Sequence, residues 1–88
     1  MISIDYDIIV LEEGNDYIAY CPELDLSSCG NSISHAKEML KKAIKLFIEE
    51  AEKMGTLYDI LEEANFKKNA NAIWTPPRMV ATEFVHMS

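Results

Sequence analysis

Two acidic residues near the start of the chain, Asp5 and Asp7, are the first candidates for chemistry. Their i,i+2 spacing on a predicted strand places both carboxylates on one face. Two-metal nucleases need several acids that converge on one point. No later acid in this sequence is required to meet the pair, although Glu62, Glu63 and Glu83 lie further along the chain. We therefore interpret the pair as a solvated acidic strand face rather than as a metal centre.

The other reactive residue types do not form a catalytic set either. Cys21 and Cys29 flank a predicted corner, where antiparallel pairing could bring them close, but reduced thiols are expected in a cytoplasmic protein. His35 and His86 lack the companions that a zinc site needs. Ser34 precedes His35 in a helical first turn, where neighbours do not face each other, and no Gly-rich phosphate loop is present. The sequence predicts a protein that is not an enzyme and uses no cofactor or metal.

Charge is distributed unevenly along the chain. Residues 1–30 hold seven of the 15 Asp and Glu residues and none of the eight Lys and Arg residues, so the remaining acids and bases balance. A surface of this kind repels nucleic-acid phosphates and attracts basic proteins. It is interpreted either as a solubilising face or as a docking face for a basic partner. The acidic candidates for partner binding are Asp5, Asp7, Asp16, Glu23 and Asp25. Trp74, which lies close to a proline pair, is a further candidate as a contact residue or a dimer clamp.

The first 30 residues read as three strands. Apolar residues alternate with others over 2–10, which predicts a strand with one buried face. The turn residues of 12–16 close a hairpin, and the segments 17–21 and 26–29 are short further strands. Strands joined this closely form an antiparallel meander.

Two helices are predicted next. Apolar residues recur at spacings of three and four over 33–54, with Ser32 as N-cap and Gly55 as the stop. A shorter helix is expected over 56–64, capped by Thr56 and ended by Asn65.

The rest of the chain is predicted to contain a linker and one more strand. Residues 66–71 are polar, the proline pair after Thr75 excludes a helix around Trp74, and 79–85 reads as a last strand. The order βββ-α-α-β predicts one α+β domain with a helix on one face of the sheet. Residues 1–66 would form its core, and 67–88 the linker and C-terminal strand. That strand either completes its own sheet or is exchanged with a second copy, and a chain of this size favours a homodimer or higher homo-oligomer.

The stretch from about Ile4 to Met54 resembles the HicB-like antitoxin family, here as a short, stand-alone domain. The family pattern is a strand followed by P-E-L, then a short segment, a Gly, a Ser or Thr cap and the opening of a helix. The matching residues are Pro22, Glu23, Leu24, Gly30, Ser32, Ile33 and Ala36. Ser34 and His35 replace the acidic residues usual in the family. His35, at the third helical position, is interpreted as a substitute for a capping Glu.

The resemblance implies a partial ribonuclease H-like fold and an antitoxin that occludes a small, basic, RNA-cleaving toxin of the HicA-like class. The alternative is an orphan oligomeric module that binds another protein or a small ligand. Many HicB-like proteins carry a further DNA-binding domain. The few residues after the last predicted strand cannot build a helix-turn-helix, so direct DNA binding by this chain is not expected.

A cytoplasmic location is expected from the sequence. No apolar run approaches the roughly 20 residues of a membrane span, and the first residues do not have the pattern of a signal peptide.

Overall fold

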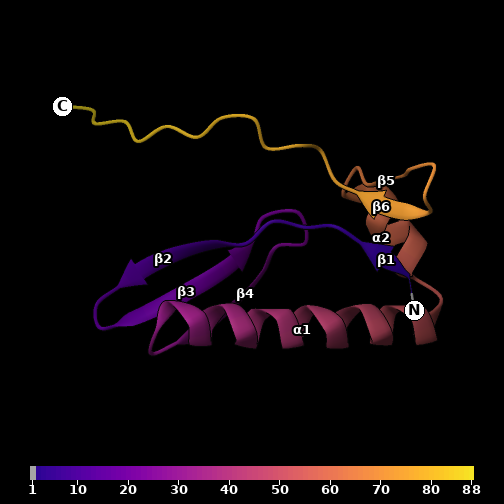
Figure 1. Ribbon diagram of the computed structural model, residues 1–88, viewed down its shortest axis with the longest axis horizontal. Helices are drawn as coiled ribbons and strands as arrows, with labels where there is room; N and C mark the ends of the chain where they lie inside the picture. The colour runs from indigo at the N-terminus through magenta and orange to yellow at the C-terminus, as the bar shows by residue number, and fades with distance from the viewer. Residues whose placement is uncertain (1) are drawn as a thin grey trace.

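The computed structural model describes residues 2–88 and has the α+β architecture expected from the sequence (Figure 1). A three-stranded antiparallel sheet lies on one long helix, and a small mixed sheet with a short helix lies at the far end of that helix. The elements in chain order are β1 (Ser3–Ile4), β2 (Ile9–Glu13), β3 (Asp16–Cys21), β4 (Leu26–Gly30), α1 (Ile33–Met54), α2 (Leu57–Glu63), β5 (Lys67–Lys68) and β6 (Ile73–Thr75).

The predicted meander is confirmed as the sheet β2-β3-β4. Its first hairpin has a two-residue loop, because Glu13 pairs with Asp16 and only Gly14 and Asn15 lie between them. Gly14 has a φ of 61°, a conformation that glycine reaches without steric cost and that tight hairpin turns require. The register of this loop fixes which side chains of β2 and β3 share a face.

The prediction of a single first strand over 2–10 is wrong. The chain forms β1, crosses over at residues 5–8, and enters β2 in the other sheet. β1 pairs in parallel with β6, and the Asp5 N–H extends this contact by donating to the Trp74 carbonyl oxygen at 2.9 Å. Alternation of apolar residues reports which side chains are buried, but it does not report which strand the backbone pairs with.

Helix α1 has the predicted bounds and covers the inner face of β2-β3-β4. Its buried stripe consists of Ala36, Leu40, Ile44, Ile48 and Ala51. The Ser32 hydroxyl oxygen accepts from the His35 N–H at 3.0 Å, and Gly55 ends the helix with a φ of 73°, so both predicted end signals are confirmed. The His35 Nδ1 accepts from the Asn31 N–H at 3.2 Å, which agrees with a capping role for this side chain.

Gly30 is needed for a reason that the sequence did not reveal. Gly30 is the last residue of β4 and is absent from the described residues with positive φ, so backbone freedom does not explain a glycine there. A Cβ at this position would lie 2.5 Å from the backbone nitrogen of Ala36 and 2.8 Å from the His35 Nδ1. The end of β4 therefore approaches the first turn of α1 too closely for any other residue.

The region after α1 differs from the sequence expectation in two respects. Thr56 has helical φ and ψ and makes no capping hydrogen bond through its side chain, so it is not the predicted N-cap. The segment 66–71 is not simply a polar linker, because Phe66 is buried in the core and the following residues form the β5–β6 hairpin. The amide oxygen of Asn69 accepts from two backbone N–H groups in this hairpin, and Asn65 has the expected positive φ.

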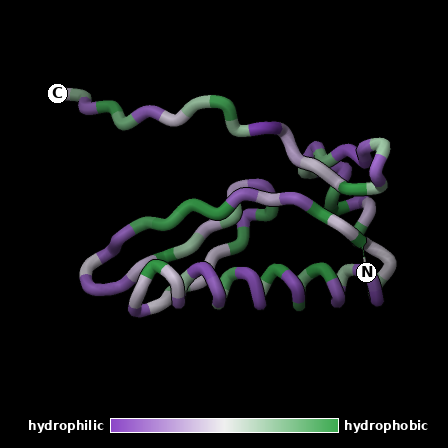
Figure 2. Tube along the Cα trace, viewed as in Figure 1, coloured by the Kyte–Doolittle hydropathy of each residue, from purple (hydrophilic) through white to green (hydrophobic). Residues whose placement is uncertain are grey.

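The predicted strand over 79–85 is also wrong for this chain. The last strand is β6, which ends before Pro76, and residues 76–88 belong to no helix or strand. They run away from the small sheet as an extended segment that ends far from the body of the molecule (Figure 1). Short apolar stretches, Met79–Ala81 and Phe84–Val85, are separated by polar residues along it (Figure 2). The pattern is that of a strand, but the chain supplies no neighbour for it.

Replacement of Gly30 by alanine is expected to destabilise the protein by about 1–3 kcal/mol, the usual cost of forcing atoms into a filled site. The loss arises because the new methyl group meets backbone atoms of α1, which cannot move without displacing the helix. Urea unfolding followed by circular dichroism measures the difference. Ser27→Ala, at an exposed position of the same strand, is the matched control and should change stability little. Equal stability of Gly30→Ala and wild type would contradict this account.

Candidate functional site

The three-stranded sheet has one covered face and one open face. Val10, Tyr17, Ala19, Cys21 and Leu26 point toward α1 and belong to the core or pack against it. The alternate residues lie on the other side of the sheet. We call these the open face. Its apolar members are Ile9, Leu11, Ile18, Tyr20 and Cys29, and Ser27 lies beside Tyr20. All five remain half-buried or exposed, and the Leu11 side chain is 53% accessible to solvent.

The register aligns the open face into two rows across the strands. Leu11 pairs with Ile18, which pairs with Cys29, and Ile9 pairs with Tyr20. Cross-strand neighbours on one face have Cβ atoms about 5 Å apart, so these side chains form one contiguous apolar patch. Exposed apolar patches on small proteins are typical of contact surfaces.

Acidic residues lie at both ends of this patch. Glu13 and Asp16 pair directly at the hairpin loop, and both are exposed. Like charges opposite each other destabilise a hairpin, so the pairing of Glu13 with Asp16 lowers the stability of the fold. At the other end, the Tyr20 hydroxyl donates to the Asp25 carboxylate at 2.9 Å. This hydrogen bond is the main reason why the pKa of Tyr20 is raised, with smaller contributions from burial and from neighbouring negative charge.

Glu23 has a structural role, because its carboxylate is hydrogen-bonded within the fold. Its Oε1 accepts from the Asp7 N–H at 2.8 Å and from the Cys21 Sγ at 3.4 Å. The carboxylate thus ties the segment before β2 to the end of β3. The residues on either side of Glu23 end the strand and reach the core, since Pro22 follows β3 and Leu24 packs against the buried cluster.

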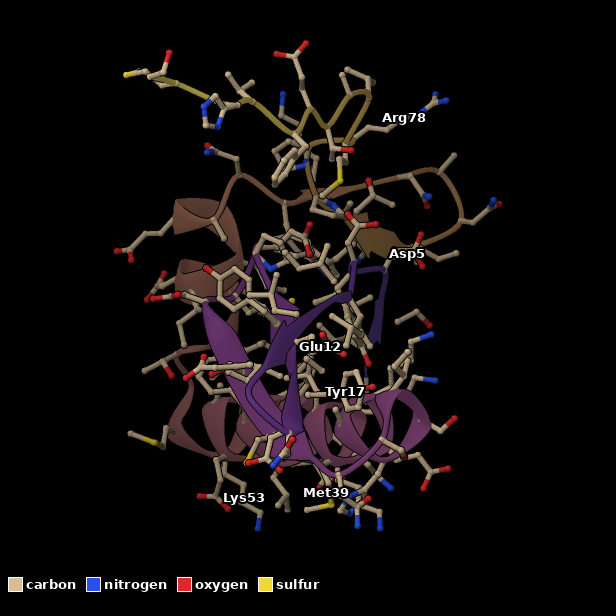
Figure 3. The ribbon with its side chains drawn as sticks, turned by 90° about the vertical axis from the view of Figure 1, so that its left-hand side faces the viewer. Asp5, Glu12, Tyr17, Met39, Lys53 and Arg78 are labelled. Atoms are coloured by element: carbon tan, nitrogen blue, oxygen red, sulfur yellow. The ribbon has the colours of Figure 1, made fainter. Side chains whose placement is uncertain are left out.

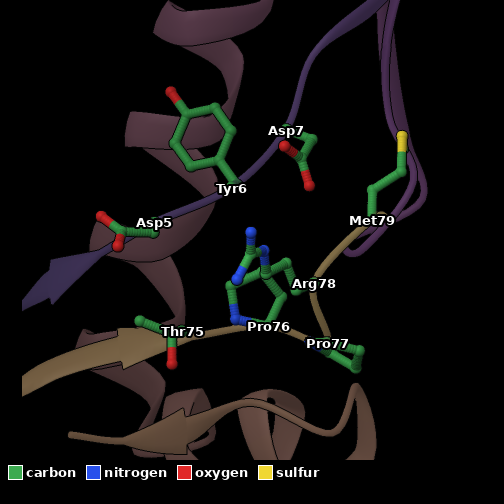
Figure 4. A pocket seen from close by; sticks show the side chains of 8 residues that line it. All are labelled: Asp5, Tyr6, Asp7, Thr75, Pro76, Pro77, Arg78 and Met79. Carbon is green, nitrogen blue, oxygen red and sulfur yellow. The ribbon is translucent and has the colours of Figure 1, made fainter. Parts of the chain in front are cut away.

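Asp5 and Asp7 lie apart from the open face, beside a hollow of about 360 Å³ (Figure 4). The hollow separates residues 5–7 from residues 75–79, at the place where the β1–β6 pairing stops. Arg78 lines the same hollow from the segment that follows β6. A basic residue, Arg78, therefore lines the same hollow as the two aspartates.

The five predicted acidic site residues consequently do not form one surface. Asp16 and Asp25 lie at opposite ends of the open face, Asp5 and Asp7 line the hollow, and Glu23 is engaged within the fold. Lys53 of α1 is separate again, because Figure 3 places it on the side of the helix that points away from the strands.

Trp74 has an intrachain role. It lies in β6, is half-buried, and packs against the core. Its ring centroid is 5.6 Å from that of Tyr58, with an angle of 31° between the ring planes. This contact holds the small sheet against α2.

The two cysteines do not approach each other, although their positions around the corner left this possibility open. Cys21 pairs with Leu26 and is buried on the covered face, whereas Cys29 pairs with Ile18 and is exposed on the open face. Both are free thiols. Within residues 2–88, no group of three or more His, Cys, Asp or Glu side chains is placed to hold a metal ion.

The apolar members of the open face were not identified from the sequence. Ile9 was assigned to the polar side of a long alternating strand, and Leu11 lay beyond the end of that strand. The signal that would have found them is the uninterrupted run Ile8–Leu11. Such a run is typical of a strand that is buried on both faces.

Comparison of the chain with family models, with curated proteins and with solved structures gave no match. Across residues 2–88, no helix is long and apolar enough to cross a membrane.

A pH dependence of stability is expected from the buried thiol. Burial is the main cause that raises the pKa of Cys21 from 9.0 to about 11. Between these values the unfolded chain releases the thiol proton and the folded chain keeps it, so stability falls as pH rises through this window. We expect Cys21→Ala to cost roughly 1 kcal/mol near pH 7.5 and progressively less above pH 9. Urea unfolding of both proteins in a Cys29→Ser background measures this difference, and a difference that does not change with pH would contradict the account.

Proposed function

We propose that this protein is a non-enzymatic binding protein that uses the open face of its sheet to cover a small basic protein. Its best candidate partner is an RNA-cleaving toxin of the HicA-like class. The observation that carries the proposal is the composition of this face, with an apolar centre, acidic residues at both ends, and no Lys or Arg anywhere in residues 1–30.

The two parts of the face would have different tasks. Protein interfaces combine an apolar centre with a polar rim, and tyrosine is enriched in them. Here Leu11, Ile18 and Tyr20 would supply the buried area. Glu13, Asp16 and Asp25 would attract and orient a basic partner, an effect that raises association rates and weakens with salt.

The proposed mechanism is occlusion. A protein that binds RNA needs a basic surface for the phosphates, and the acid-rimmed face is complementary to such a surface. Once covered, the toxin surface could not reach its substrate. The chemistry would remain entirely that of the partner.

The resemblance to HicB-like antitoxins supports this partner class, and several of the residues that carry it have structural positions. Glu23, in the middle of the P-E-L motif, joins two segments through its carboxylate. Gly30 allows the close approach of β4 to α1, and Ser32 caps the helix. These residues support the fold that the motif implies, while the open face supports the binding.

A second candidate function is an orphan oligomeric module. The observation that favours it is the amount of exposed apolar surface on the last residues of the chain, which suits self-association. The reading frame next to the gene distinguishes the two. A short, strongly basic product favours the antitoxin, and the lack of one favours the orphan module.

The test is co-expression of the chain with the product of that neighbouring frame, followed by measurement of the complex and of RNA cleavage. We expect co-purification, suppression of cleavage, and an affinity that decreases with salt. The double variant Glu13→Lys/Asp16→Lys should weaken binding by roughly tenfold or more, equivalent to about 1.4 kcal/mol, and should reduce the salt dependence. Both positions are exposed and make no contact with the core, so the fold should be retained.

Two further variants complete the design. Leu11→Ser removes apolar area without a change of charge, so it should weaken binding but leave the salt dependence intact. Glu38→Lys makes the same kind of charge reversal on the exposed side of α1, and it should leave affinity nearly unchanged. Equal effects of Glu38→Lys and of the open-face variants would exclude this surface, and an unaltered rate of RNA cleavage in the complex would exclude occlusion.

A further inference from the structure

The last eleven residues, which we call the C-terminal arm (78–88), are apolar and uncovered. Every residue of the arm is exposed, and Phe84, Met87 and Val80 have solvent accessibilities of 100%, 90% and 83%. Met79 and Val85 are also among the exposed large hydrophobic residues. Val80 and Phe84 fall on one side of an extended backbone, and Met79 and Val85 on the other. A segment with apolar residues on both sides is typical of a strand inside a sheet rather than of a solvated tail.

Strand β2 has an unpaired backbone edge and apolar residues that are not fully buried. It is an edge strand of its sheet, so one side of its backbone has no strand partner within the described chain. The residues Ile8–Leu11 are consecutive apolar positions, yet none of them is fully buried. Helix α1 packs mainly against β3 and β4 and touches β2 least. An apolar edge strand left in this state promotes pairing with another chain.

The arm does not occupy this edge in its own chain. The pairing of β6 with β1 reaches Trp74, and β6 ends at Thr75. Pro76 and Pro77 follow, which have no N–H to donate and restrict the backbone before them. The hollow beside Asp5 and Asp7 opens at the same place. Beyond it the arm runs separately from the sheet, as Figure 1 shows.

We propose that the arm of one molecule pairs with the free edge of β2 in a second copy of this chain, and that two copies exchange arms reciprocally. The added strand would satisfy backbone groups on both segments. It would also place Val80 and Phe84 beside one face of β2, and Met79 and Val85 beside the other. A two-fold symmetric exchange uses the same pair of surfaces twice and closes the assembly as a dimer.

This dimer goes beyond the proposed function and does not depend on it. Edge pairing is held mainly by the backbone of β2. Leu11 borders both surfaces, whereas Ile18 and Tyr20, the other docking residues, lie on β3 and away from the free edge. Failure of the chain to bind a basic protein would therefore leave the arm exchange untouched, and the reverse also holds.

The first experiment measures the mass of the purified full-length chain by light scattering at micromolar concentrations. We expect twice the mass of one chain. Val80→Asp/Phe84→Asp should reduce this to the mass of a single chain, because two carboxylates cannot enter the sheet uncompensated. Both positions are exposed in the single chain, so the variant should fold, and circular dichroism checks this. The matched control is Leu46→Asp/Met54→Asp, which changes exposed apolar residues on α1 in the same way and should remain a dimer.

A second experiment distinguishes exchange between chains from docking within one chain. In a Cys29→Ser background, one preparation carries Leu11→Cys and another carries Phe84→Cys. After mixing, a short bismaleimide should join the two chains, since it tolerates a shift of register. Replacing Leu11→Cys by Glu38→Cys should abolish this product.

Three results would overturn the proposal. The first is a single-chain mass for the wild type. The second is a dimer that survives Val80→Asp/Phe84→Asp. The third is a chain carrying both Leu11→Cys and Phe84→Cys that links only to itself, which would show that the arm docks on its own β2.

Discussion

The packing of α1 against the inner face of β2-β3-β4 is the interaction on which the rest of the structure depends. One stripe of small and medium apolar residues, from Ala36 to Ala51, covers Ala19, Cys21 and their neighbours. The approach is so close at the start of the helix that Gly30 has no room for a side chain. One helix can cover only one face of a sheet, so the same contact that builds the core leaves the opposite face and the β2 edge uncovered.

This uncovered surface explains why so much apolar area remains exposed in a short chain. The sequence is 49% hydrophobic, a share that is ordinary for a domain with one core. Only one face of the sheet receives that core, and Leu11, Val80 and Phe84 remain in contact with water. Small domains gain stability by completing such surfaces with a partner or a second copy. Binding and folding would then draw on the same hydrophobic driving force.

Local signals in the sequence were sufficient for the antiparallel meander, for both helices and for the two caps of α1, because each of these depends on residues close together in the chain. The predicted cap of α2 at Thr56 is wrong. Predictions that depend on contacts between residues far apart in the sequence were wrong. The break between β1 and β2 is set by β6, some 70 residues away in the register Ser3 to Ile73. Charge counting located an acidic region, but it could not show that Glu23 bonds the Asp7 amide or that Arg78 lines the hollow beside Asp5. The pattern over 79–85 predicted a strand that the structure does not form, because no strand of the described chain pairs with this segment.

The arm would pair with the β2 edge of the sheet, whereas a basic partner would bind its open face, so the two interactions can be distinguished. A strand added at β2 would be held by backbone hydrogen bonds, which do not depend on side-chain charge. It would also widen the open face by one strand without covering Tyr20 or Asp25, which lie on the far side of β2. A basic partner docking there would meet the acidic ends and the apolar centre still exposed. In an exchanged dimer each copy would therefore keep its own face, so that one dimer could bind two partners.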